Sequence, residues 1–316
     1  MKHLSILLLW LTIGCASANV SRSSSSAPMD NLAYTYDGNR ITEVNGMQYN
    51  HDANGNVTID GSHETQAAYN LLNLPCRIEG LQSGEGLNYA FLADGTKVAM
   101  TADDGSGYAY AGDMVFTRSA QGAYSFESMA YGNGRIEGPT NMVRKYVTDH
   151  LGNVRAIVTG NNVVERNDYY PFGGRHARNT LPVLSTNHWR LGAKETQPSA
   201  TGSLVDFGAR MYDPHTGRWT TRDPMAWKYV GMGPYNYCWN DPVNLVDPDG
   251  LSTSTHTDGN GNVIAVINDG DYGIYKHVNM YTDKDVLKVY TLSNKSAGGE
   301  YMGDSWQIDS LTKVQK

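Results

Sequence analysis

The side chains best suited to chemistry in this 316-residue chain are carboxylates that precede proline. Asp-Pro pairs begin at Asp213, Asp223, Asp241 and Asp247. Such an aspartate commonly starts a turn, because its carboxylate accepts nearby backbone N–H groups. Two carboxylates held close together can instead share one proton, so that one acts as a base and the other as an acid. Most of the four aspartates are expected to be turn residues.

Other arrangements that could do chemistry are missing from the sequence. No Cys-x-x-Cys motif or Cys/His cluster indicates zinc, so we expect no metal and no cofactor. Beyond the first 18 residues the only cysteines are Cys76 and Cys238. Both are expected to be small buried side chains, and a disulfide between them stays an alternative in an oxidising compartment. His150 is expected to hydrogen-bond turn backbone rather than to act as a catalytic base.

The composition predicts that short strands position these carboxylates. The chain has 34 glycines, and 21 tyrosines against 5 phenylalanines. Glycine, asparagine and aspartate form turns that need a positive φ, and tyrosine favours strands. The net charge of -7 argues against a nucleic-acid partner, because surfaces that bind nucleic acid are normally basic.

The first 18 residues are predicted to be a signal peptide. Lys2 precedes an apolar run over residues 4–13, and the small residues Ala-Ser-Ala at 16–18 form a cleavage signal. In an alternative interpretation Cys15 is lipidated, and the lipid associates the protein with a membrane. Both interpretations predict an exported protein, either secreted or associated with the cell envelope. The Ser-rich residues 19–30 are predicted to be a linker.

Alternating aromatic residues and Asp-Gly or Asn-Gly turns recur from residue 31 to residue 145. The clearest copies are Tyr-Thr-Tyr-Asp-Gly at 34–38 and Asp-Ala-Asn-Gly-Asn at 52–56, with looser copies at 88–98 and 108–113. Alternation with period two predicts strands, and the turns predict hairpins. A single hairpin cannot bury its apolar face, so neighbouring hairpins are expected to stack into a continuous sheet.

Four further segments carry a resemblance to a known family: Tyr146–Arg155, Asp168–Gly173, Ala209–Trp219 and Asn240–Leu251. With the repeats, they resemble the Rhs/YD-repeat proteins of the bacterial polymorphic-toxin type. The resemblance implies an all-β fold in which stacked YD-repeat β-hairpins form a curved sheet or partial β-shell. It divides the chain into YD-like repeats (31–145), an RHS repeat-associated core domain (146–251) and a variable C-terminal tail (252–316).

The resemblance also implies a candidate site. In delivered toxins of this family the core ends in an intramolecular aspartic protease, which cuts just after an Asp-Pro-x-Gly-Leu motif. Carried over to this chain, the catalytic carboxyls are Asp223 and Asp247, and the cut falls between Leu251 and Ser252. Arg222 is expected to hold one carboxylate ionised or to bind the developing oxyanion.

Three functions follow as hypotheses. The first is an exported core fragment that serves as a β-scaffold for a variable tail in intercellular competition or cell-surface interaction, with an immunity protein as partner if the tail is toxic. The second is a self-cleaving precursor that releases residues 252–316. The third is a binding module for surface carbohydrate or other cell-envelope components. The tail shows no nuclease, deaminase or ADP-ribosylation motif that would identify an activity.

Overall fold

The computed structural model of the protein describes residues 32–176, 184, 186–198, 201–228, 232–251, 254–257, 263–267, 273–276 and 300–304. The predicted signal peptide, Cys15 and the Ser-rich linker lie outside these described residues. Among the residues that are described, no helix has the length and apolar character needed to cross a bilayer.

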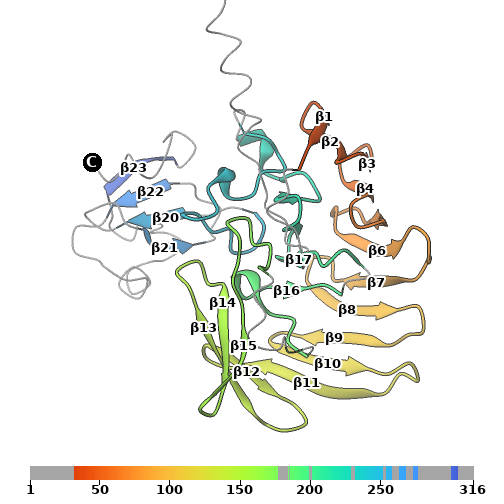
Figure 1. Ribbon diagram of the computed structural model, residues 1–316, viewed down its shortest axis with the longest axis vertical. Helices are drawn as coiled ribbons and strands as arrows, with labels where there is room; N and C mark the ends of the chain where they lie inside the picture. The colour runs from red at the N-terminus through yellow and green to blue at the C-terminus, as the bar shows by residue number, and fades with distance from the viewer. Residues whose placement is uncertain are drawn as a thin grey trace, which may run out of the picture.

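A meander of fifteen antiparallel strands dominates the fold, and each strand pairs with the next one in sequence (Figure 1). The bounds are β1 Tyr34–Asp37, β2 Arg40–Val44, β3 Met47–His51, β4 Val57–Asp60, β5 Thr65–Tyr69, β6 Pro75–Gly80, β7 Gly86–Phe91, β8 Lys97–Ala102, β9 Gly107–Ala111, β10 Met114–Arg118, β11 Tyr124–Ala130, β12 Gly134–Glu137, β13 Val143–Thr148, β14 Val154–Thr159 and β15 Asn162–Arg166. This order confirms the expected stack of hairpins.

Two of the turns between strands share the same hydrogen-bonding pattern. Asp52 Oδ1 accepts the backbone N–H of Asn56 at 2.9 Å, and Asp52 Oδ2 accepts the amide Nδ2 of the same asparagine at 2.8 Å. Asp149 binds Asn153 in the same way, at 3.0 and 3.1 Å. The residue before each asparagine is a glycine with positive φ, for example Gly55 at +90°, a region that disfavours residues with a Cβ. The Asp-x-x-Gly-Asn motif therefore sets the turn between β3 and β4 and the turn between β13 and β14.

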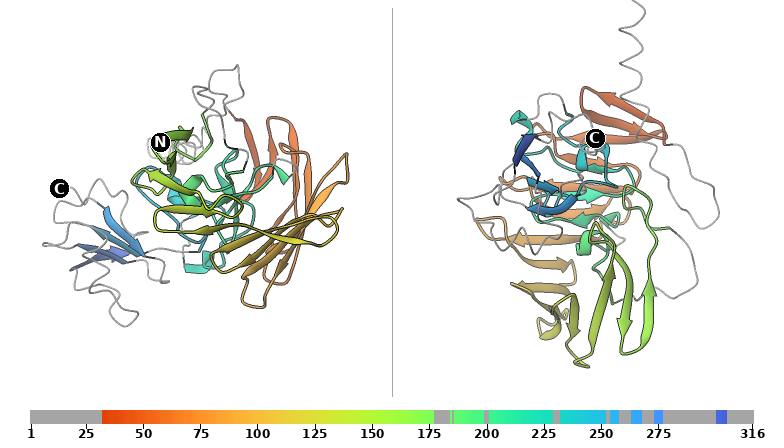
Figure 2. Two further views of the ribbon diagram at one scale, coloured as in Figure 1. Left: turned by 90° about the horizontal axis from the view of Figure 1, so that it is seen from below. Right: turned by 90° about the vertical axis from the view of Figure 1, so that its left-hand side faces the viewer.

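The sheet curves because its hairpins carry repeated irregularities. The register shifts near the end of the first strand in several pairs, as between Asn50 and His51 and between Ala90 and Phe91. Such β-bulges bend a strand and increase its twist. Seen from below, the strands wrap around a central segment without closing into a barrel (Figure 2). The prediction of an all-β fold with a curved sheet is confirmed.

A second, smaller sheet and short 3-10 helical turns form the described part of that central segment. The strands run in the order β16-β17-β18-β19. Their bounds, with those of the 3-10 helices, are η1 Leu191–Ala193, β16 Glu195–Thr196, β17 Val205–Asp206, β18 Met211–Asp213, β19 Arg218–Trp219, η3 Ala226–Lys228 and η4 Cys238–Asn240. A turn over residues 214–217 joins β18 to β19.

Large aromatic side chains of the central segment fill the space inside the curved sheet. Tyr212 and Trp219 are 0% and 2% exposed, and Phe207 and Tyr237 pack against both rings. From the sheet side, the same apolar cluster includes Leu32, Ile41, Val44 and Tyr49. The first hairpins and the central segment therefore share one core, although about 180 residues separate them in sequence.

Further details concern the last strands of the sheet, the cysteines and His150. β15 ends at Arg166, and Tyr169 forms an isolated bridge with Arg175. Residue 146, the expected start of the core domain, lies inside β13, so the sheet continues through this position. Cys76 is half-buried and Cys238 is buried, and both are free thiols. His150 hydrogen-bonds the carbonyl oxygen of Val243 at 2.9 Å, which is a contact with the central segment rather than with its own turn.

The described part of the tail contains a third sheet, with strand order β21-β20-β22-β23. The bounds are β20 Ser254–Thr257, β21 Val263–Ile267, β22 Gly273–Lys276 and β23 Glu300–Asp304. In Figure 1 these blue strands stand apart from the fifteen-stranded sheet.

Glu165 ties the last hairpin to the central segment through a buried ion pair. The Glu165 side chain is fully buried, and its carboxylate accepts Arg190 Nε at 2.9 Å and Nη2 at 3.2 Å. Asn167 Nδ2, the backbone N–H of Leu184 and Asn187 Nδ2 also donate to it, at 2.8, 2.9 and 3.3 Å. Burial opposes ionisation, but these hydrogen bonds and the arginine charge hold the pKa of Glu165 below its ordinary value.

We expect Glu165→Gln to lower the free energy of unfolding by about 3 kcal/mol, because it leaves the Arg190 charge without its buried counter-ion. Exposed Glu85 provides the control: Glu85→Gln is expected to change stability by less than about 0.5 kcal/mol. The Glu165 contribution should be full at neutral pH and shrink as acid protonates the carboxylate. Urea unfolding at two pH values measures both effects, and equal stability of the two variants would contradict this role.

Candidate active site

Arg210 lies at the centre of the candidate site, in the turn between β17 and β18. Its guanidinium is almost fully buried, at 2% exposure, and lies 4.2 Å from the ring centre of Trp219. The nitrogen Nη2 lies 3.1 Å from Asp223 Oδ2 and 3.4 Å from Asp247 Oδ2. One arginine nitrogen therefore joins the two aspartates, which are 24 residues apart in sequence.

The same arginine also reaches the chain close to the expected cut. Arg210 Nε donates a hydrogen bond to the carbonyl oxygen of Gly250 at 2.5 Å. The backbone N–H of Ala209 donates to the carbonyl oxygen of Asp249 at 3.0 Å. Gly250 has a φ of +80°, and a Cβ there would lie 3.1 Å from the backbone nitrogen of Arg210. Glycine is needed at this position because the two segments approach so closely.

Each aspartate is also bonded to its own turn. Asp223 Oδ1 accepts the backbone N–H of Met225 at 2.7 Å. Asp247 Oδ1 accepts the backbone N–H groups of Gly250 at 2.7 Å and Asp249 at 3.3 Å. The Asp-Pro motif thus starts a turn at both positions, as it commonly does. The second oxygen of each carboxyl group extends beyond its turn to Arg210.

Burial and charge at the site favour the protonated form of a carboxyl group. Burial raises the pKa of Asp223, and the positive charge of Arg210 only partly offsets this effect. Burial also raises the pKa of Asp247, again against Arg210 and the backbone N–H of Gly250. One cation faces two carboxyl groups, so full ionisation would leave an uncompensated buried negative charge. The arrangement is therefore suited to a carboxyl pair in which one member keeps its proton.

The structure brings together two of the three residues assigned from the sequence. Asp223 and Asp247 share the site, whereas Arg222 is exposed and its side chain lies against the turn at Gly55. In the described part of the chain, Arg222 forms no ion pair with either aspartate. The sequence assignment missed Arg210, although it stands at the head of the Arg-Met-Tyr-Asp-Pro segment that carried the resemblance.

The expected cleavage position is only half described. Leu251 is half-buried, and its backbone N–H donates to Asp249 Oδ1 at 3.0 Å. Ser252 lies outside the described residues. Only the Leu251 side of the expected Leu251–Ser252 cut is therefore described. Leu251 directly follows Gly250, whose carbonyl oxygen accepts a hydrogen bond from Arg210.

Relatives of the chain include bacterial toxin subunits. Toxin subunit YenC2 of Yersinia entomophaga is 26% identical over 227 residues, which are 71% of this chain and 20% of that protein. Toxin subunit YenC1 of the same organism is 26% identical over 198 residues, 62% of this chain and 18% of that protein. Salivary gland surface protein 1 of Aedes aegypti is 33% identical over 123 residues, 36% of this chain and 4% of that protein. The chain thus spans about a fifth or less of these relatives.

Solved structures with the same fold are also toxin assemblies. The Photorhabdus luminescens Tc holotoxin pore matches with a TM-score of 0.56 and 20% identity, over 74% of this chain and 14% of that chain. The TcdB2-TccC3 crystal structure matches with a TM-score of 0.52 and 18% identity, over 74% of this chain and 15% of that chain. No protein-family profile matches the chain.

The repeat motifs, the hairpin sheet and the toxin-subunit relatives agree with one another. The resemblance drawn from the sequence is confirmed. In its repeat motifs and its fold the chain is similar to the Rhs/YD-repeat proteins of the toxin type.

Proposed function

We propose that this protein is an exported β-scaffold that carries its C-terminal segment and frees it by cutting its own chain between Leu251 and Ser252. Similarity to toxin subunits supports the scaffold role, since it extends over 71% of the chain in sequence and 74% in fold. The sequence of the first 18 residues supports export. The released product is residues 252–316.

The observation that carries the proposed cleavage is the shared arginine. Arg210 binds Asp223, Asp247 and the carbonyl oxygen of Gly250 from one buried guanidinium. A purely structural aspartate in an Asp-Pro turn needs only its own backbone N–H partners. Two such turns joined on one buried cation, next to an Asp-Pro-x-Gly-Leu segment, instead form an acid–base pair beside a candidate peptide bond.

The proposed reaction is hydrolysis of one peptide bond. The ionised carboxylate takes a proton from water while the protonated carboxyl donates a proton to the carbonyl oxygen of Leu251. The hydroxyl adds to the Leu251 carbonyl carbon, and the tetrahedral intermediate then expels the Ser252 amine, which leaves with a proton. Because the substrate belongs to the same chain, proximity contributes much of the rate, and modestly activated groups suffice.

The biological setting follows as part of the proposal. An exported scaffold that releases a variable tail suits intercellular competition or cell-surface interaction. Cell-envelope components are then the expected surroundings, with lipid attachment at Cys15 as one route to the membrane. An immunity protein is the expected partner if the tail is toxic.

The carbohydrate-binding alternative has less support from the described surface. Tyr124 and Tyr131 are the most exposed tyrosines, at 59% and 57%. They lie at opposite ends of β11, which separates them by roughly 23 Å of extended chain. A sugar-stacking platform would require neighbouring rings, which these two tyrosines do not provide.

Intact mass of the purified mature chain tests the cleavage directly. The wild-type protein is expected to give two masses that divide between Leu251 and Ser252. Asp223→Asn and Asp247→Asn should each give one uncut mass, because an amide can neither donate nor take the required proton. Asp241→Asn is the matched control, since it changes an Asp-Pro turn outside the site and should leave cleavage unchanged.

A single uncut wild-type mass would overturn the proposed cleavage and leave both aspartates as turn residues. Cleavage at the same bond in both site variants would exclude the carboxyl pair as its cause. The same spectrum also measures the N-terminus: a start at Asn19 indicates signal-peptide removal, and a lipid mass on Cys15 indicates a membrane anchor.

Lysine substitutions at Arg210 and at Arg222 test which of the two arginines supports cleavage. Arg210→Lys is expected to slow cleavage about a hundredfold, because lysine keeps the charge but cannot hold three oxygens from one planar group. Arg222→Lys is expected to stay within about twofold of wild type, because Arg222 is exposed. Refolding from denaturant followed by gel densitometry gives both rates. Slower cleavage in Arg222→Lys alone would reverse the assignment.

A further inference from the structure

Lys97 of β8 reaches from the large sheet to the central segment and ends between two carboxyl groups. Its Nζ lies 2.5 Å from Glu195 Oε2 and 2.5 Å from Asp206 Oδ2. The side chains of all three residues are at most 11% exposed. In sequence, Lys97 is 98 residues from Glu195 and 109 residues from Asp206, so the fold alone brings this amine to the two carboxyl groups.

The two carboxyl groups meet because their strands pair. Glu195 of β16 is the direct partner of Asp206 of β17 in an antiparallel pair. Residues directly opposite each other project from the same face of a sheet, and like charges in such positions repel. When all three groups are ionised, the cluster holds two negative charges against the one positive charge of Lys97. A reaction that removes charge from this buried cluster would therefore relieve it.

Aromatic and apolar side chains keep water away from Lys97. The centre of the Tyr110 ring lies 4.5 Å from Lys97 Nζ, and the Tyr110 hydroxyl donates a hydrogen bond to Glu195 Oε1 at 2.8 Å. Tyr110 also packs against a buried apolar cluster, whose members are Ile78, Tyr89, Met100, Leu204 and Met211. Exclusion of water favours condensation of an amine with a carboxyl group, because bulk water drives the reverse hydrolysis.

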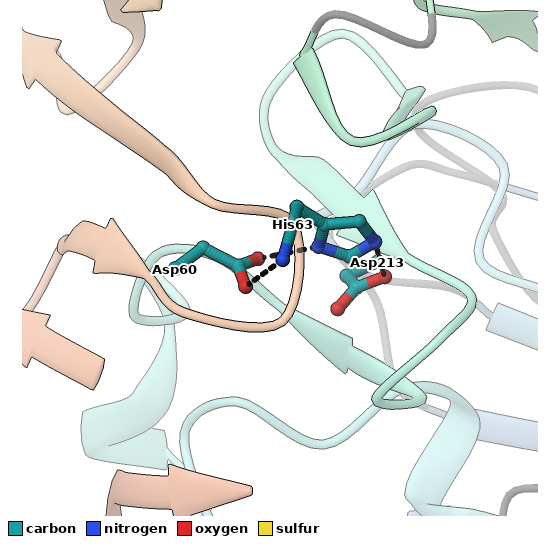
Figure 3. A group of neighbouring side chains, drawn as sticks. All are labelled: Asp60, His63 and Asp213. Carbon is teal, nitrogen blue, oxygen red and sulfur yellow. Dashed lines mark hydrogen bonds and ion pairs between the residues drawn. The ribbon is translucent and has the colours of Figure 1, made fainter. Parts of the chain in front are cut away.

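A second buried cluster of the same charge pattern provides a comparison. Asp60, His63 and Asp213 also place one nitrogen-bearing side chain between two carboxyl groups, one from the large sheet and one from the central segment (Figure 3). His63 Nδ1 lies 2.7 Å from Asp60 Oδ2, and Nε2 lies 3.8 Å from Asp213 Oδ1. An imidazole lacks the primary amine of a lysine, so this cluster stays non-covalent.

We propose that Lys97 and Asp206 condense to form a covalent side-chain amide, with Glu195 as the catalytic residue that moves the protons. The bond would join β8 of the large sheet to β17 of the central segment. It would hold the scaffold together whether or not the chain is cut after Leu251.

Hydrogen bonds indicate which carboxyl group is attacked. Asp206 Oδ1 accepts the backbone N–H of Gly208 at 2.8 Å, so this donor is in place to stabilise the negative charge that forms on Oδ1 during attack. Asp206 Cγ lies within about 3.7 Å of Lys97 Nζ, because one carbon–oxygen bond separates it from Oδ2. This limit is close to the separation from which well-positioned atoms react. Glu195, held by the Tyr110 hydroxyl, is left as the base.

The condensation balances without any co-reactant. Burial opposes the charge on Lys97, but the carboxylates of Asp206 and Glu195 hold its pKa above the ordinary value. The first step is therefore transfer of an ammonium proton to Asp206 Oδ2 along their 2.5 Å hydrogen bond. The neutral Nζ then attacks Cγ while Glu195 takes a second proton from Nζ. Glu195 passes this proton to the Oδ2 hydroxyl, which leaves as water with the electrons of the broken C–Oδ2 bond.

Intact mass of the mature full-length protein tests the proposal. The scaffold up to Leu251 is expected to weigh one water less than its sequence predicts, in the uncut chain and in the cut product alike, so the result does not depend on the proposed cleavage. Tryptic digestion should yield a branched peptide that joins residues 78–118 to residues 195–210, because trypsin does not cut after an acylated lysine.

Variants test the assigned roles. Lys97→Arg should restore the full mass, because a guanidinium keeps the charge but is far less nucleophilic than an amine. Glu195→Gln should also restore it, because an amide cannot take the amine proton. Lys194→Arg is the matched control: Lys194 neighbours Glu195 in sequence, but its Nζ lies over the Phe207 ring, 5.9 Å from the ring centre. The control should still lack one water. If a variant fails to fold, the branched peptide of the wild type decides alone.

Three results would overturn the proposal. The first is a wild-type chain of full mass with separate peptides ending at Lys97 and Arg210, which would leave Lys97 in a buried ion pair. The second is a missing water that maps to an Asp-Gly pair such as Asp94–Gly95, because a succinimide there loses the same mass. The third is a branched peptide that persists in Glu195→Gln, which would remove Glu195 from the reaction.

Discussion

Burial of the inner face of one open sheet is the constraint on which the rest of this structure depends. Fifteen strands in a meander bury little apolar surface by themselves, so another part of the chain must cover the sheet. Residues 186–251 supply that cover with Phe207, Tyr212, Trp219 and Tyr237, whose rings pack edge-on or tilted against one another. The candidate site is part of the same packing, because the Arg210 guanidinium lies on the Trp219 ring. Any change that loosens this core should also move the arginine that joins the two aspartates.

Buried charges set the position of the cover on the sheet. Lys97 of β8 lies 2.5 Å from both Glu195 and Asp206 of the central segment, and Glu165 of β15 binds Arg190. Such pairs add little net stability, but an incorrect register would leave several buried charges without partners, which is costly. The Lys97 and Arg210 sites each place one cation against two carboxyl groups. At the Arg210 site burial raises the pKa values of Asp223 and Asp247, and the positive charge of Arg210 only partly offsets this effect.

Local features of the fold could be predicted from the sequence, whereas contacts between distant segments could not. The hairpins could be located from period-two alternation and from Asp-Gly or Asn-Gly turns, because each of these patterns is contained within a few consecutive residues. The resemblance supplied Asp223 and Asp247, but Arg222 was chosen for its adjacency to Asp223. Arg210 reaches the aspartates through the β17–β18 turn, which no local pattern reveals. His63 and Asp213 meet only because the central segment folds back onto the second hairpin pair, so their cluster was missed entirely.

The proposed self-cleavage depends most on one property of the site, which is that Asp223 and Asp247 share a proton beside Arg210. Carboxyl-carbon NMR titration of aspartate-labelled protein, assigned with Asp223→Asn and Asp247→Asn, measures this directly. Both groups are expected to titrate above the ordinary aspartate value of 3.8. Asp223→Asn should lower the apparent pKa of Asp247, because it removes a neighbouring negative charge. Two independent titrations at or below 3.8, unchanged by either substitution, would contradict the account and leave two ordinary Asp-Pro turns that happen to share an arginine.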